Sequence, residues 1–114
     1  MRVDKKTKHL TQRLQAGEIA VINHADIDRI AAETLVAAAP SAVLNAAKST
    51  TGRYPNMGPS IIVDAGITLI DDLGSAIMNL KEGSTVTVEG NAVYQKGELV
   101  AQGVLQTPGT IAVD

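Results

Sequence analysis

The sequence contains no cysteine, no tryptophan and no phenylalanine, and two tyrosines are its only aromatic residues. Without cysteine, disulfide bonds and thiolate metal sites are excluded, and the redox compartment cannot be inferred from the sequence. With so few aromatic rings the core must be aliphatic, and platforms for stacking nucleic-acid bases are nearly absent. The composition therefore favours a globular domain with an aliphatic core.

Long apolar runs and an excess of one charge are also missing. The 114 residues include 10 basic and 12 acidic side chains, a net charge of −2, so we expect no nucleic-acid partner. The longest apolar runs, such as Ile61–Val63 and Val36–Ala39, are too short to span a bilayer, so this chain is not expected to insert into a membrane. The basic N-terminus has no apolar stretch behind it, which argues against a signal peptide.

The length is that of one domain, large enough to bury its own core. Residues 1–16 are polar, and we interpret them as an arm or an edge strand that ends at a turn at Gln15–Gly17. A phosphate-binding arm is the alternative, because the segment carries several basic side chains: Lys5, Lys6, Lys8 and Arg13. Residues 17–114 are expected to form a single α/β domain.

Three short apolar runs predict buried strands: Ile19–Ile22, Ala42–Asn45 and Ile67–Ile70. A helix is expected between the first two strands, and this order predicts a right-handed crossover with parallel pairing. A second, short helix is expected to start at Gly58–Pro59, since proline at the first helical position loses no hydrogen bond, and to end at Gly66.

The first helix has a predicted cap and a predicted apolar face. Asn23 or Asp26 can cap its N-terminus, and Pro40 stops it. Its apolar positions recur at helical spacing: Ile27, Ile30, Ala31, Thr34 and Leu35. We therefore expect Ile30 to be buried and Asp28 to lie at the surface.

The C-terminal third changes character. After one or two helical turns at Ser75–Leu80, Thr85–Glu89 alternates strictly, as a half-buried strand does. Turn residues then separate Ala92–Gln95 and Leu99–Leu105, which predicts hairpins. The predicted class is α/β: one small domain with a short parallel or mixed sheet, flanking helices and a C-terminal β meander.

One polar segment after a predicted strand is the candidate binding site. Functional residues gather on loops of this kind, where hydroxyls, backbone amides and a guanidinium can hold an anion. The alternative is a long structural turn. The candidate ligand- or partner-binding residues are Lys48, Ser49, Thr50, Thr51, Gly52, Arg53, Tyr54 and Asn56.

Other polar residues are expected to be structural. His9 and His24 lack partners at metal-ligand spacing, and Asp71–Asp72 is more typical of a cap or turn than of a cation site. No nucleophile elbow, phosphate-binding glycine loop or dinucleotide motif is present. We therefore predict no catalytic residue, no metal site and no cofactor in this chain.

Several segments resemble the amino-terminal part of the SteA family: Ile19–His24, Leu44–Ala47, Gly52–Pro59 and Val63–Ile67. The resemblance covers most of the chain, and the Gly-Arg-Tyr-Pro-Asn block is its most specific part. It implies a membrane-anchored protein of Gram-positive bacteria that acts at the cytokinetic ring. In that family a thiamine pyrophosphokinase-like region and a transmembrane segment follow, and this chain contains neither.

The order of elements also resembles the swivelling β/β/α domains of phosphoenolpyruvate-utilising enzymes. Those domains carry a phosphorylatable histidine at the start of the short helix, whereas residues 49–60 contain no histidine. The resemblance therefore implies a shared fold without the phosphotransfer chemistry.

Two functions remain open. The first is a non-catalytic interaction or regulatory domain of a cell-division protein, cytoplasmic, with a protein partner or the missing pyrophosphokinase-like domain facing the loop. The second is part of a nucleotide-binding enzyme whose catalytic region lies outside this chain, with Arg53 neutralising phosphate charge. Self-association and an anionic or nucleotide ligand are compatible with either.

Overall fold

The computed structural model describes residues 1–49 and 58–107. Over these residues strands and helices first alternate, and a series of short strands follows. In chain order the elements are β1 (Arg2–Val3), α1 (Thr7–Thr11), β2 (Ile19–Ile22), α2 (Arg29–Ala37), β3 (Ala42–Asn45), α3 (Gly58–Asp64), β4 (Thr68–Asp71), η1 (a 3₁₀ helix, Ser75–Asn79), β5 (Thr87–Glu89), β6 (Ala92–Gln95), β7 (Glu98–Gln102) and β8 (Val104–Leu105).

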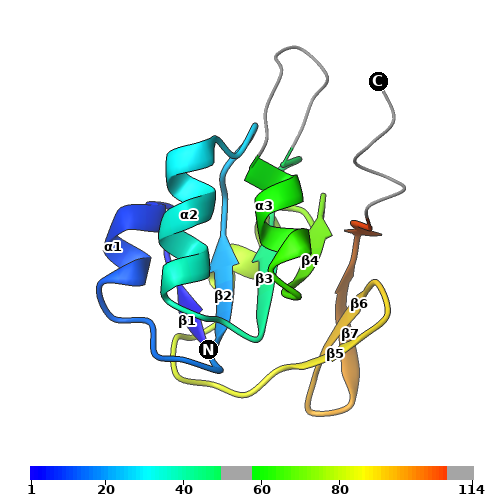
Figure 1. Ribbon diagram of the computed structural model, residues 1–114. Helices are drawn as coiled ribbons and strands as arrows, with labels where there is room; N and C mark the ends of the chain where they lie inside the picture. Colours follow the sequence, from blue (N-terminus) through cyan, green and yellow to red (C-terminus); the bar gives the residue numbers. More distant parts are fainter. Residues whose placement is uncertain (50–57, 108–114) are drawn as a thin grey trace.

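A five-stranded sheet in the order β1-β2-β3-β4-β8 forms the centre of the fold. The first four strands are parallel and β8 is antiparallel to β4, which confirms the predicted parallel crossovers. Figure 1 shows α1, α2 and α3 side by side on one face of this sheet. The opposite face is covered by η1 and by an antiparallel sheet of β5, β6 and β7. The predicted class, a small α/β domain with β/β/α layers, is confirmed.

Two aliphatic cores lie on the two faces of the central sheet. In β2, Ala20 and Ile22 pack towards the helices, whereas Val21 packs towards η1 and the hairpins. This alternation follows from the pleat of a strand, which sends successive side chains to opposite faces. Because both faces are covered, β2 and β3 are buried and read as continuous apolar runs.

The predicted burial of Ile30 is wrong. Helix α2 begins only at Arg29, and its N-cap is Asp28, whose carboxylate accepts the Ala31 N–H at 2.7 Å. Ile27 is buried but precedes the helix, so it does not share the helical spacing. The buried face is Ala32 and Leu35, and Ile30 is 78% exposed.

The predicted strand Leu99–Leu105 is interrupted. Gly103 separates β7 from β8, and β8 leaves the meander to join the central sheet beside β4. A side chain at Gly103 would lie only 2.1 Å from the Asp71 carbonyl oxygen. This close approach requires glycine and brings the chain back to the end of β4.

Residues 1–16 contain β1 and α1. Strand β1 forms one edge of the central sheet, beside β2. Leu10 and Leu14 are buried against the helix-side core. The segment therefore supplies an edge strand and part of the core.

Candidate functional site

The carboxyl ends of the parallel strands bring three polar side chains together. Asn45 ends β3, Asp71 ends β4, and Ser49 lies in the loop after β3. All three are buried, with Asn45 and Ser49 at 0% and Asp71 at 2% exposure. In α/β sheets this edge is the usual place for ligands, so it is the candidate site.

Asn45 is the centre of this cluster. Its Oδ1 accepts the backbone N–H groups of His24 at 3.0 Å and Ala47 at 3.1 Å. Its Nδ2 donates to the His24 carbonyl oxygen at 2.9 Å and to Ser49 Oγ at 3.0 Å. One amide side chain therefore satisfies groups from the ends of β2 and β3, because it has two donors and two acceptor sites.

Asp71 connects the loop after β3 to the end of β8. Ser49 Oγ donates to one carboxylate oxygen of Asp71, and Gln106 Nε2 donates to the other at 2.8 Å. Burial raises the pKa of Asp71, and the hydrogen bonds from Ser49, Gln106 and Asn45 offset part of that rise. Because Ser49 is buried and hydrogen-bonded to this carboxylate, the pair is suited to positioning the loop.

Both described flanks of the candidate loop meet Ile27. The Ser49 carbonyl oxygen accepts the Ile27 N–H at 2.9 Å. On the other side, a Cβ at Gly58 would lie 2.0 Å from the Ile27 carbonyl oxygen, so this position must be glycine. The Lys48 carbonyl oxygen also accepts the Asp26 N–H at 3.0 Å. Ser49 and Gly58, the described residues on either side of residues 50–57, therefore both lie beside Ile27.

The structure places two of the eight candidate residues. The Lys48 side chain is exposed, whereas Ser49 is buried in the cluster. The other candidates lie outside the described residues: Thr50, Thr51, Gly52, Arg53, Tyr54 and Asn56. The sequence reasoning missed the roles of Asn45 and Gln106. A polar residue closing the apolar run Ala42–Asn45 was the available signal for Asn45.

The other polar residues that the sequence singled out take structural contacts. His24 Nδ1 lies 3.0 Å from the Ala25 carbonyl oxygen. Asp72 has a positive φ of 56° and donates its backbone N–H to the Ala47 carbonyl oxygen at 3.0 Å, as a turn residue does. Within residues 1–49 and 58–107, no three His, Asp or Glu side chains are grouped as metal ligands.

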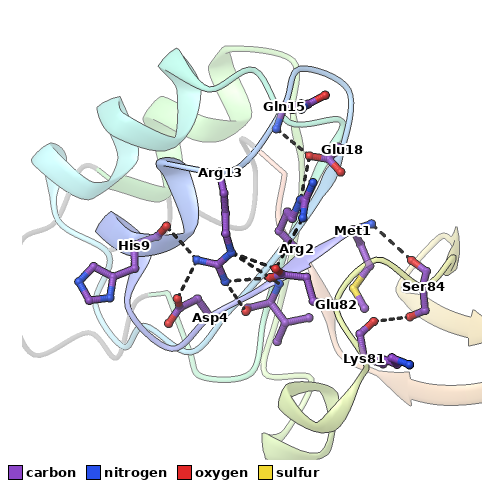
Figure 2. Close-up of polar contacts among 11 residues, drawn as sticks. Met1, Arg2, Asp4, His9, Arg13, Gln15, Glu18, Lys81, Glu82 and Ser84 are labelled. Atoms are coloured by element: carbon purple, nitrogen blue, oxygen red, sulfur yellow. Dashed lines mark hydrogen bonds and ion pairs between the residues drawn. The ribbon is translucent and has the colours of Figure 1, made fainter.

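A second polar cluster, which the sequence did not predict, lies at the outer edge of β1 (Figure 2). Arg13 Nε and Nη2 donate to the Glu82 carboxylate at 3.0 and 2.8 Å, and Nη1 donates to Asp4 at 3.0 Å. The same guanidinium donates to the carbonyl oxygens of Val3 and His9, both at 2.9 Å. All five N–H donors of Arg13 are therefore used.

This cluster covers the backbone of an edge strand. The Val3 N–H donates to Glu82 at 3.0 Å while the Val3 carbonyl oxygen accepts from Arg13, so both outward groups of that residue are paired. The Gly83 N–H donates to the Met1 carbonyl oxygen at 2.9 Å. Covering an edge in this way prevents another strand from pairing with it.

In comparisons with known proteins, no family model, no curated protein and no solved structure matches the chain. Along the described ranges, no helix has both the length and the apolar character needed to cross a membrane.

Proposed function

We propose that this chain is a non-catalytic interaction and regulatory domain whose binding segment is Lys48–Asn56. The observation that carries the proposal is the anchoring of that segment. Ser49 is tied to Asn45 and Asp71 on one side, and Gly58 packs against Ile27 on the other. A rigid scaffold that fixes both ends of a polar loop is typical of binding surfaces.

The buried cluster supports a binding role over a catalytic one. Ser49 carries a hydroxyl in this segment and Asp71 a carboxylate beside it, and both side chains are buried and hydrogen-bonded to each other. A catalytic pair must reach a substrate atom within hydrogen-bond distance. These residues instead hold the loop for recognition by a partner or an anionic ligand.

The resemblance to the SteA family supplies the cellular setting of the proposal. The chain then serves as the amino-terminal, cytoplasmic domain of a membrane-anchored protein at the cytokinetic ring. Its loop faces a protein partner or the pyrophosphokinase-like region of the same protein. Arg53 is the side chain best suited to carboxylate or phosphate, because its planar fork binds either group bidentately.

The test compares Arg53→Ala with Arg29→Ala in the full-length protein fused to a fluorescent protein. Arg29 is exposed on α2 and pairs with Glu33 at the surface, so its substitution controls for the loss of one positive charge. We expect the Arg53 variant to lose localisation to the division site while the Arg29 variant keeps it.

Nucleotide binding by the same proteins separates the alternative. If the full-length protein binds a nucleotide, and Arg53→Ala abolishes that binding, the chain is part of a nucleotide-binding enzyme. If both variants localise as the parent does and neither affects binding, Lys48–Asn56 is a structural turn and the proposal fails.

A further inference from the structure

A groove of about 740 Å³ lies between the start of α1 and the first turns of α2. These two helices are neighbours on the same face of the central sheet (Figure 1). One wall is formed by residues 5–9, and the other by His24, Asp28, Ile30, Ala31 and Thr34. Among the described residues, the lining includes none of Asn45, Lys48, Ser49 and Asp71.

The groove is basic within a chain whose net charge is −2. Lys5, Lys6 and Lys8 line it and are exposed. The described part of the chain offers these three lysines no salt-bridge partner, whereas Arg2 and Arg13 are engaged with acidic side chains. Figure 2 shows the His9 ring pointing away from the Arg13 cluster. The nearby arginines therefore stabilise the fold, and the lysines remain available to a ligand.

The acidic side chain that lines the described part of the groove already accepts a hydrogen bond. Asp28 is its only acidic lining residue among those described, and its carboxylate caps α2 by accepting the Ala31 N–H at 2.7 Å.

A further group lacks a partner: Thr7 also lines the groove, and its buried hydroxyl has no hydrogen bond within the described residues. Buried polar groups normally have partners, so this hydroxyl marks a site where a ligand can supply one.

The α2 wall of the groove includes apolar surface. Ile30 is 78% exposed, the highest value among the exposed large hydrophobic residues of the described chain, and Ala31 and Thr34 are half-buried beside it. A single exposed isoleucine is ordinary on a protein surface. Here it lies within a groove that also carries three lysines, so the surface offers an apolar contact surrounded by positive charge.

We infer that this groove docks an acidic peptide segment of a partner protein, with an apolar side chain of that segment packed on Ile30. Carboxylates of the segment pair with Lys5, Lys6 and Lys8. Charge complementarity selects the acidic partner, and a groove between two helices is a common seat for a peptide with an apolar face. A flat anionic bilayer would contact only the rims of such a hollow. The inference stands whether or not the proposed function of Lys48–Asn56 holds.

The experiment titrates the whole ¹⁵N-labelled chain with short synthetic peptides and follows amide chemical shifts. The probe peptide contains glutamate and leucine, with the leucines at helical spacing. One control peptide replaces each glutamate by lysine, and a second replaces each leucine by serine. We expect saturable shifts at residues 5–9 and 30–34 with the probe, weaker shifts with the serine peptide and none with the lysine peptide.

Matched variants test which side chains are responsible. The triple change Lys5→Glu, Lys6→Glu and Lys8→Glu should weaken binding by about tenfold or more. The control triple, Lys81→Glu, Lys96→Glu and Gln102→Glu, adds nearly the same negative charge at exposed positions outside the groove and should leave the affinity unchanged. Because it leaves Lys48–Asn56 unaltered, failures of the two proposals can be told apart.

A separate variant keeps the test valid if the groove triple does not fold. Ile30→Ala changes an exposed side chain and should weaken binding of the glutamate–leucine peptide by about tenfold. Equal binding of the lysine peptide, equal losses in both triples, or shifts confined to other surfaces would overturn the inference. So would binding to phosphatidylserine vesicles that depends on Lys5, Lys6 and Lys8 without any binding of the acidic peptide.

Discussion

The two polar clusters of this domain use opposite chemistry. The inner cluster, at the ends of β3 and β4, is buried and joins an amide, a hydroxyl and a single carboxylate. The outer cluster, at the edge of β1, is partly exposed and joins two arginines to several acids, with side-chain exposures of 36% for Arg13 and 32% for Glu82. Burying unpaired charge is costly, whereas surface charges keep much of their hydration.

The difference in burial indicates which cluster contributes more to the stability of the fold. A buried neutral donor or acceptor that loses its partner keeps the full cost of lost hydration, so the inner cluster should tolerate little change. Exposed ion pairs contribute less because water and salt screen them. The inner cluster should therefore carry the larger stability effect despite containing fewer charges.

The largest effect is expected at the inner cluster, for Asn45→Ala. This change removes the side-chain partner of the His24 and Ala47 backbone groups and one of the hydrogen bonds of the Ser49 hydroxyl, which keeps its bond to Asp71. We expect a loss of about 3 kcal/mol in the free energy of unfolding, measured by urea denaturation. Asn23→Ala is the matched control at an exposed position and should cost at most about 0.5 kcal/mol. Similar losses for both would remove the distinction between the clusters.

A smaller effect is expected at the outer cluster, for Glu82→Gln. It removes the charge that pairs with Arg13 and should cost roughly 1–2 kcal/mol at neutral pH, less in 1 M salt. Glu98→Gln, at an exposed position of β7, is the control and should have no measurable effect. A Glu82→Gln cost that is independent of salt would contradict the electrostatic explanation.

The pH dependence of the same variant gives an independent check. Hydrogen bonding to Arg13 lowers the pKa of Glu82 from 4.5 to about 2. A lowered folded-state pKa gives stability that is present above 4.5 and is lost as the pH falls towards 2. The difference in unfolding free energy between the parent and Glu82→Gln should therefore shrink across that interval.

Asp71→Asn tests for a pH dependence of stability of the opposite sign at the inner cluster. Burial raises the pKa of Asp71 above 3.8, so the folded state binds its proton more tightly than the unfolded chain. The parent should then lose stability relative to Asp71→Asn as the pH rises above 3.8 through the raised pKa. Unfolding free energies of the two proteins from pH 3.5 to 8 measure this difference. A difference that moves in the other direction would mean that the carboxylate is better stabilised than its burial implies.

The strands were predictable because their signals are local. Ile19–Ile22 is apolar throughout and Ala42–Asn45 is apolar up to its final asparagine, and each forms a strand with those bounds. The hairpin turns were also local, since Gly90 and Gly97 have the positive φ that such turns require. Local patterns of this kind need no knowledge of the partner strand.

The clusters were not predictable because they join distant residues. Arg13 and Glu82 are 69 positions apart, and Ser49 and Asp71 are 22 apart. No spacing rule along one element connects such pairs. The buried face of α2 was predicted wrongly for a different reason. Its N-cap is Asp28, so Ile27 lies outside the helix and cannot define its buried face.

The smallest effect, expected for Ile30→Ala, provides the baseline for comparing the clusters. Ile30 is 78% exposed, so truncating it should change the free energy of unfolding by no more than about 0.5 kcal/mol. Leu35→Ala, on the buried face of the same helix, should cost about 2–5 kcal/mol because it leaves a cavity. Urea unfolding of the two variants determines which face of α2 is packed.

If Ile30→Ala costs as much stability as Leu35→Ala, the helix buries the face that carries Ile30, and the exposed apolar surface of the groove does not exist. If Ile30→Ala is neutral for folding, any loss of peptide binding in that variant reports on the groove alone.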